Sequence, residues 1–360
     1  MKPKNIRIKD IAQLAGVSQG TVDRVLHKRG NVSKAATEKV NRVLAKSNYK
    51  PNLIARTLGN SKIYTLAVLL PDPQMDPFWK QSYDGMLSAQ HQLTQLSLKI
   101  ELENHFFDLN SKESFQKAAL EIIRTKPDGV LIAPLFFNTA ISFLKDLQQA
   151  TVPFVLVNTN IAESQSIAFI GQDLYKSGRL GAQLLFQKKQ TAKSYIILHI
   201  DESLQNAFHL KEKERGFTDY LTEAGLSNQP ISITIDHQPG KNFEKAVAEI
   251  IGSNQPAGVL ISTSKAYQVA PIIKSINPAI QVVGYDLIEA NLNLLQTGKI
   301  DFIINQNPFR QSRLGIQILA NHLFFKRSFQ PQYLFPLEVI TSENAASYLL
   351  HTGYSADLPE

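Results

Sequence analysis

Two hydrophobic periodicities divide the chain near residue 60. Before that point, apolar residues recur every three or four positions, which places them along one face of a helix. From residue 63 onward, runs of consecutive Val, Ile and Leu such as YTLAVLLP alternate with amphipathic helical segments. The pattern predicts a small helical module followed by an α/β body.

The small module contains three predicted helices. Gly16 provides a turn after the first helix, and Ser18 and Ser33 are expected to cap the second and third. The apolar positions expected to face inward are Ile8, Ile11, Ala12 and Ala15, then Val22, Val25 and Leu26, and finally Ala36, Val40, Val43 and Leu44. Two short helices joined at a glycine-containing turn and supported by a third predict a helix-turn-helix module over residues 1–50.

Basic residues are concentrated in the same part of the chain. Residues 1–60 hold 13 of the 38 Lys and Arg residues but three of the 31 acidic residues, a net charge of +10. The remaining 300 residues therefore carry −3, which completes the overall net charge of +7. A basic module on a nearly neutral body is typical of a protein that binds a polyanion through one domain.

The polar face of the second helix is the candidate DNA-reading surface. With the apolar side facing inward, Gly20 and Arg24 project on the opposite side, flanked by Thr21 and Asp23. The N-terminal half of such a helix reaches base edges in the major groove. Because phosphates would repel an acid there, Asp23 is expected either to accept from a cytosine amino group or to pair with His27.

The remaining polar side chains of this segment are expected to contact different parts of DNA. Arg24 can form a bidentate contact with guanine, with a phosphate contact as the alternative, and Gln19 can contact adenine. Lys28 and Arg29 lie past the middle of the helix. They are expected to contact phosphates, which adds affinity without sequence information.

The whole segment IKDIAQLAGVSQGTVDRVLHKRGNVSKAATEKVNRVLAKSNYKPNLIARTLG resembles the DNA-binding head and hinge of the lactose-repressor (LacI/GalR) family. The match runs without gaps and includes AGVS, TV-RVL and NY-PN. The resemblance implies that Gln19, Gly20 and Arg24 approach bases. Because Gly20 has no side chain, base reading is expected to depend on Gln19, Arg24 and Asp23.

The resemblance also implies a hinge helix over residues 51–61. A helix this short is marginal alone, because nucleation costs more than one or two turns return. In the family, two hinge helices pair in the minor groove, and the leucine at the position of Leu58 inserts between bases, a use of apolar wedges that is physically sound. Asn52 and Arg56 are counted with it as DNA-binding residues. The alternative for Leu58 is packing against the following domain.

The body is predicted to be α/β, with two doubly wound parallel-sheet lobes. The predicted strands cover 64–71, 98–106, 127–135, 153–158, 194–200, 231–235, 256–263 and 280–286. The predicted helices cover 81–93, 111–125, 138–150, 214–225, 242–253 and 270–276. This body resembles the type I periplasmic-binding-protein fold, and DPFWKQSYDGM is similar to a segment of its ribose- and xylose-type members.

The two lobes of this effector-binding domain, 62–360, are expected to share the chain discontinuously. The first lobe is predicted to comprise about 62–160 and 288–325, and the second about 161–287 and 326–345. Ligands of such sheets bind outside the carboxyl ends of the strands, which in a two-lobed domain is the cleft between the lobes.

Candidate effector-binding residues follow the predicted strands. They are Asp76, Phe78, Trp79, Asn158, Asn160, Lys213, Asp286 and Gln306. Aromatic rings there can stack on the apolar face of a sugar while carboxylates accept from its hydroxyl groups. Core packing is the alternative for Trp79. For Asp286 and Gln306, the alternative is to cap the next helix or to order a crossover between lobes.

Three departures from the resembled family bear on the ligand. Asn158 and Asn160 replace the Asp-Arg of ribose-type relatives, which removes a charged fork and argues against ribose. Lys213 stands where the sensors often have arginine, and a compact ammonium differs from a planar guanidinium. Ser264 and Lys265 occupy a loop where many relatives have Asn-Asp.

Composition and motifs exclude several other classes. Without cysteine, the chain has no disulfide, thiolate metal site or cysteine nucleophile. G-x-S-x-G, the P-loop, G-x-G-x-x-G after the first strand and H-E-x-x-H are all absent, so no enzyme, cofactor or metal site is expected. The N-terminal segment lacks the apolar stretch of a secretory signal, and no apolar run is long enough for a membrane span, which favours the cytoplasm and no membrane partner.

These observations predict a cytoplasmic, sequence-specific repressor that binds pseudo-palindromic operator DNA as a homodimer. Its operator affinity is expected to change when a small effector, a mono- or oligosaccharide or a derivative, binds between the lobes. The absence of a heptad-bearing tail in SYLLHTGYSADLPE favours a dimer over a tetramer. The alternative function is that of a solute-binding protein that senses or carries a sugar without binding DNA.

Overall fold

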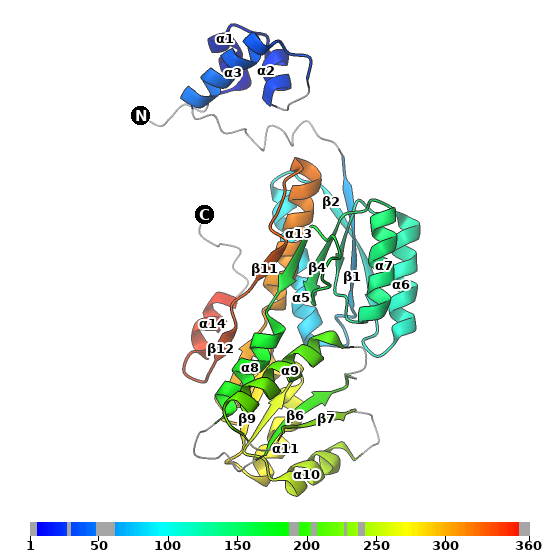
Figure 1. The fold of residues 1–360 in the computed structure, drawn as a ribbon, viewed down its shortest axis with the longest axis vertical. Coiled ribbons are helices and arrows are strands. Elements are labelled where there is room, and N and C mark those ends of the chain that lie inside the picture. The colour runs from blue at the N-terminus through cyan, green and yellow to red at the C-terminus, as the bar shows by residue number, and fades with distance from the viewer. Residues whose placement is uncertain are drawn as a thin grey trace. The chain divides into compact units, whose positions relative to one another are not determined.

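The computed structural model describes residues 6–26, 30–47, 62–186, 194–202, 207–226, 229–236 and 242–352, with side chains described up to residue 348 (Figure 1). The chain divides into two units, Met1–Asn60 and Ser61–Glu360. The predicted hinge lies outside the described residues. So do the candidate DNA-binding residues Lys28, Arg29, Asn52, Arg56 and Leu58.

The first unit contains the three predicted helices, α1 (Ile8–Ala15), α2 (Gln19–Leu26) and α3 (Lys34–Ser47). Gly16 closes α1 with φ 61°, a left-handed conformation that glycine adopts without strain. The hydroxyls of Ser18 and Ser33 accept from the backbone N–H of Thr21 (3.1 Å) and Ala36 (3.3 Å), which confirms both predicted caps.

The core of this unit is formed by the predicted inward face of each helix. Its buried members are Ile11, Ala12, Ala15, Val22 and Val40, with partly buried Ile8, Val25, Leu26, Val43 and Leu44 packed against them. The helix-turn-helix prediction is therefore confirmed.

The second unit is built on two six-stranded sheets. The first sheet is parallel throughout, in the order β11-β5-β4-β3-β1-β2. Its strands are β1 (Tyr64–Pro71), β2 (Ile100–Phe107), β3 (Gly129–Ile132), β4 (Phe154–Asn158), β5 (Ala168–Gly171) and β11 (Gln332–Leu334). Helices α5 (Pro77–Gln95) and α13 (Pro308–Phe325) pack together on one side, and α6 (Lys112–Thr125) and α7 (Phe137–Gln149) cover the other (Figure 1).

The second sheet has the order β12-β10-β9-β8-β6-β7, and its edge strand β12 is antiparallel to β10. The strands are β6 (Tyr195–Ile200), β7 (Ile231–Ile235), β8 (Gly258–Ile261), β9 (Gln281–Tyr285), β10 (Phe302–Asn305) and β12 (Glu338–Ile340). The helices are α8 (Leu174–Leu185), α9 (Phe208–Glu223), α10 (Phe243–Asn254), α11 (Ala266–Ile276), α12 (Glu289–Gln296) and α14 (Ala345–Thr352). Along β6, Tyr195 and Ile197 pack with residues of α8 and α9, whereas Ile196 and Leu198 pack with residues of α10 and α11.

The two-lobed parallel α/β architecture is thus confirmed, but three strands lie in a different lobe from the one predicted. β5 pairs with β4 and belongs to the first sheet, β10 pairs with β9 in the second, and β11 pairs with β5 in the first. The predicted boundaries near 160, 287 and 325 are wrong for these strands. Each strand has only three or four residues, and so short a segment carries no information about which sheet it joins, because pairing is decided by distant partners.

The chain consequently passes between the sheets after β5, after β10 and after β11. One side chain connects all three crossovers. The side-chain amide of Gln172, which follows β5, donates to the carbonyl oxygens of Asn305 (2.9 Å) and Pro336 (2.7 Å). These bonds hold the three connecting segments together where the lobes meet. None of the helices in the described ranges combines the length and the apolarity that a bilayer span requires.

Candidate functional site

The exposed face of α2 is the candidate DNA-reading surface. Gln19, Gly20 and Arg24 are exposed, while Thr21 and Asp23 are half-buried. Arg24 and Gly20 thus lie away from buried Val22, as predicted. Since His27 lies outside the described residues, the two roles expected for Asp23 stay open, and the base contacts of this helix stay predictions.

The second candidate site is a narrow cavity of about 30 Å³ at the carboxyl ends of the strands of both sheets. Seven predicted effector residues line it: Asp76, Phe78, Trp79, Asn158, Lys213, Asp286 and Gln306. Six of them converge because they follow a strand or begin a helix at the edge where the two lobes face each other, and Lys213 reaches the same edge from within α9. Asn160 does not line it, although it lies two residues beyond Asn158, and it is half-buried elsewhere.

The first-lobe wall begins with Asp76, the N-cap of α5. Its carboxylate accepts from the backbone N–H of Phe78 (2.8 Å), and Pro77 occupies the first turn. Burial raises the pKa of Asp76 to about 6, while the hydrogen bond from Phe78 acts in the opposite direction. Phe78 and Trp79 form an edge-to-face pair with ring centroids 4.8 Å apart. Trp79 therefore serves both the cavity wall and the core of the first lobe.

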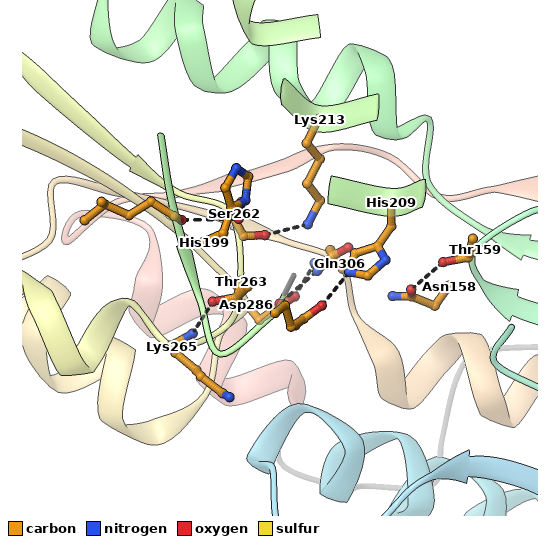
Figure 2. Close-up of polar contacts among 12 residues, drawn as sticks. Asn158, Thr159, His199, His209, Lys213, Ser262, Thr263, Lys265, Asp286 and Gln306 are labelled. Atoms are coloured by element: carbon orange, nitrogen blue, oxygen red, sulfur yellow. Dashed lines mark hydrogen bonds and ion pairs between the residues drawn. The ribbon is translucent and has the colours of Figure 1, made fainter. Parts of the chain in front are cut away.

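The second-lobe wall contains the carboxylate of Asp286, which is hydrogen-bonded to Gln306. Gln306 donates from its backbone N–H (3.2 Å) and its side-chain amide (2.8 Å) to the carboxylate of Asp286 (Figure 2). Burial raises the pKa of Asp286 to about 7, against the opposing effects of Lys213 and Gln306. Helices α12 and α13 are capped by Ile288 and Asn307, so the alternative that Asp286 and Gln306 cap the next helix is wrong.

Lys213 projects from α9 toward the same wall (Figure 2). Its ammonium donates to the carbonyl oxygen of Ser262 (3.0 Å) and lies 3.7 Å from the ring centroid of Tyr285. Burial lowers the pKa of Lys213 to about 8, although the carboxylates of Asp286 and Glu202 act to raise it. A cation–π contact and a carbonyl together compensate part of the cost of burying this charge.

Six further residues line the cavity but were not predicted: Leu135, Glu202, His209, Ser262, Thr263 and Ser264. The most strongly paired are His209 and Glu202, at 2.8 Å (Figure 2). Burial acts to raise the pKa of Glu202, but His209 outweighs it and holds that pKa below its usual value. Two sequence signals were available: Glu202 follows β6, and His209 lies four residues before Lys213 on one helix face.

A hydrogen-bonded chain joins the two walls through α13. The side-chain oxygen of Gln311 accepts from the backbone N–H of Asn158 (3.0 Å), and its amide donates to the carbonyl oxygen of Gln306 (2.8 Å). Asn158 belongs to the first-lobe wall, and Gln306 is bonded to Asp286 on the second-lobe wall. Buried, directional hydrogen bonds therefore connect the two walls.

Another hollow lies at the amino ends of the first sheet, lined by residues that include Lys62, Tyr64, Asp128 and Lys326. Lys62 is paired with Asp128 at 2.9 Å and lies over the ring of Tyr64. This hollow contains none of the predicted effector residues and lies at the wrong edge of the sheet for a ligand site of this fold.

The helix-turn-helix head and the two-lobed α/β body define a class of regulators that joins a DNA-binding module to a binding-protein fold. Residues 66–327 match the periplasmic binding protein domain family, and residues 7–52 match the bacterial regulatory proteins of the lacI family. The chain belongs to the LacI family of DNA-binding transcriptional regulators, which is not a family of enzymes, and its sensor has the periplasmic-binding-protein fold.

Individual relatives agree with this assignment. The chain is 26% identical over 289 residues to the ribose operon repressor of Lactococcus lactis subsp. lactis (strain IL1403), covering 78% of this chain and 81% of that one. A LacI transcriptional regulator from Bacteroides fragilis has a TM-score of 0.73 at 23% identity, covering 80% of this chain and 100% of that one. A carbohydrate transporter from Acidothermus cellulolyticus 11B, in complex with myo-inositol, has a TM-score of 0.69 at 14% identity, covering 82% and 100%. At such identities the two structures show the fold alone.

Proposed function

We propose that this regulator is a cytoplasmic repressor that binds a pseudo-palindromic operator as a homodimer and senses a sugar or related polyol in the cavity between its lobes. The observation that carries the proposal is the composition of that cavity. An aromatic pair, Phe78 and Trp79, lies on the first-lobe wall, and the carboxylates of Asp76 and Asp286 come from opposite walls. Rings that cover C–H faces and carboxylates that accept from hydroxyl groups are the complement of a polyol.

The position of the cavity supports control of DNA binding by the ligand. A ligand that contacts both walls favours a closed arrangement of the lobes, because only that arrangement makes all the contacts at once. The series of hydrogen bonds from Asn158 through Gln311 and Gln306 to Asp286 would couple the two walls of the cavity within the protein. Two binding sites on one chain, each favouring its own lobe arrangement, are what an allosteric regulator requires.

The relatives support the same proposal. The related repressor is named for a ribose operon, and the carbohydrate transporter of the same fold binds myo-inositol. A solute-binding protein without DNA binding is the weaker alternative, because residues 7–52 match the DNA-binding head.

The test begins with the full-length protein and sheared genomic DNA. Fragments that stay bound are sequenced to define the operator, and affinity is measured by fluorescence anisotropy with and without a panel of sugars. A sugar that changes operator affinity supports the proposal, and log K should fall linearly with log salt because phosphates are neutralised. Sedimentation should give twice the chain mass of 40.2 kDa. A salt-independent affinity, or an operator affinity that no polyol changes, contradicts the proposal.

A further inference from the structure

The cations at the cavity already have partners within the protein. His209 is bonded to Glu202 at 2.8 Å, and Lys213 donates to the carbonyl oxygen of Ser262 and lies over the ring of Tyr285. Lys265, which follows the lining residue Ser264, is paired with Asp201 at 2.9 Å. An anionic ligand would have to break the ion pair of His209 or of Lys265 to gain either cation, and Lys213 is already attracted by the carboxylates of Asp286 and Glu202.

The carboxylates present the opposite situation. In the described part of the chain, Asp76 and Asp286 form no ion pair with a Lys, Arg or His side chain. Asp76 accepts from the backbone amide of Phe78, and Asp286 accepts from the backbone and side-chain amides of Gln306. Asp76 is 4% and Asp286 1% exposed. Buried carboxylates bonded to one or two amides retain lone pairs for further donors. Each can accept from a ligand hydroxyl in a charge-assisted hydrogen bond.

We infer that the cavity selects an uncharged polyol or sugar and excludes sugar acids and sugar phosphates of the same stereochemistry. This inference rests on the proposed function and adds the charge class of the effector. An added carboxylate or phosphate would lie near Asp76 and Asp286 in a site with little water, where like charges repel strongly. Its desolvation would be repaid only in part, because His209 and Lys265 are already in ion pairs and Lys213 is shared with Asp286 and Glu202.

Matched pairs of ligands test the inference on the full-length protein. The pairs are D-galactose with D-galacturonate, D-glucose with D-glucuronate and with D-glucose 6-phosphate, and D-ribose with D-ribose 5-phosphate. Thermal shift identifies the pairs that respond, because a bound ligand stabilises the folded state. Titration calorimetry then gives both affinities at pH 7.5. The neutral member of a responding pair is expected to bind at least about tenfold more tightly than its anionic partner.

One substitution and its control separate a charge effect from shape. Asp76→Asn removes a carboxylate from the cavity and keeps an N-cap residue for α5, so the fold is expected to persist. The affinity ratio of the neutral to the anionic member should fall in this variant. Asp84→Asn removes a carboxylate from the same helix, where it pairs with Lys80 and does not line the cavity, and should leave the ratio unchanged.

The possible outcomes distinguish failure of the charge selectivity from failure of the proposed sugar-sensing function. An anionic member that binds as tightly as its neutral partner, or more tightly, overturns the inference and leaves the polyol sensor intact. A ratio that falls equally in Asp76→Asn and Asp84→Asn also overturns it, because the discrimination would then not arise in the cavity. No response to any member of the panel contradicts the proposed function itself.

Discussion

Gln306 binds both carboxylate oxygens of Asp286, one through its backbone N–H and the other through its side-chain amide. Asp286 follows β9 in the second lobe, and Gln306 lies where the chain leaves β10 for α13 of the first lobe. Asp286 has a left-handed backbone, with φ 68°. The pair therefore fixes the carboxylate of Asp286, which lines the cavity, to the crossover segment between β10 and α13.

Removal of the side-chain half of this interaction is expected to destabilise the effector-binding domain. Gln306→Leu should lower its free energy of unfolding by about 1–3 kcal/mol, because a buried acceptor loses a donor. Urea unfolding measures the change. In a double-mutant cycle with Asp286→Asn, the two changes should be non-additive by at least about 0.5 kcal/mol. Additive changes would show that the contact does not couple the two residues.

The stability of the domain should fall as the pH rises from about 4 to about 7. Asp76 and Asp286 have pKa values raised from 3.8 to about 6 and about 7, so the folded state binds more protons than the unfolded state over that range. Their contribution to stability is complete below pH 3.8 and is lost as the pH passes the raised values. Lys213, with its pKa lowered from 10.5 to about 8, contributes the opposite slope above pH 8.

The substitution Asp286→Asn isolates the contribution of Asp286 to the pH dependence of the stability of the domain. Relative to the wild-type chain, the variant should gain stability between pH 5 and pH 8, because it cannot carry a buried charge. Urea unfolding at four pH values in this interval measures the difference. Parallel curves for the two proteins would mean that Asp286 is not held protonated by its surroundings.

Arg24→Ala is expected to relax the preference for one base pair of the operator, at a cost of roughly 1–3 kcal/mol. The exposed guanidinium of Arg24, in the last turn of α2, suits a bidentate contact with guanine. Binding to single-base variants of the operator measures the effect. Arg42→Ala, on the exposed side of α3, is the matched control and should leave the base preference unchanged. An equal loss on all sequences with Arg24→Ala would identify a phosphate contact instead.

Gly178→Ala should destabilise the second lobe and displace Lys213. A Cβ atom at Gly178 of α8 would lie 1.8 Å from the carbonyl oxygen of Lys213 on α9, so the helices would have to separate. The expected loss is about 1–3 kcal/mol or more, as for other overpacked interiors, together with weaker ligand binding.

Gly252→Ala provides the control for that substitution. Gly252 lies in α10, and an added Cβ atom there would have nothing within 4 Å. The substitution should raise the free energy of unfolding by about 0.5–1 kcal/mol, because alanine has the better helix propensity. Thermal and urea unfolding of both variants test the contrast. Equal stabilities for the two would contradict the tight packing of α8 on α9.

The sequence predicted most of the long elements for reasons that are local. The eight predicted strands correspond to β1, β2, β3, β4, β6, β7, β8 and β9. Six of them are largely apolar runs buried on both faces, whereas the edge strands β2 and β7 are only partly buried. β5, β10, β11 and β12 have three or four residues each, too few to establish a period. α8, α12, α13 and α14 were also missed. In α8, two glycines lower the helix propensity, yet one of them is required where α9 crosses.

The candidate cavity shows the same division. Residues that follow predicted strands, such as Asp76 and Asp286, were found because all carboxyl ends of a parallel sheet meet at one edge. Asn160 was wrongly placed in the cavity, because a direction that alternates residue by residue cannot be read beyond the end of a strand. His209 needed the packing of α9 against the second sheet to bring it there, whereas Glu202 follows β6 and was overlooked.

The sequence by itself determined the helix-turn-helix head, the α/β body and the kind of side chain that lies at each strand end, since these follow from short-range periodicity, capping and charge. Only the tertiary structure decided which strand belongs to which lobe, how Gln172 ties the three crossovers, and that Lys213 is engaged by Ser262 and Tyr285. These features depend on contacts between residues far apart in the chain. Their partners are selected by the packing of the whole domain, which no local pattern encodes.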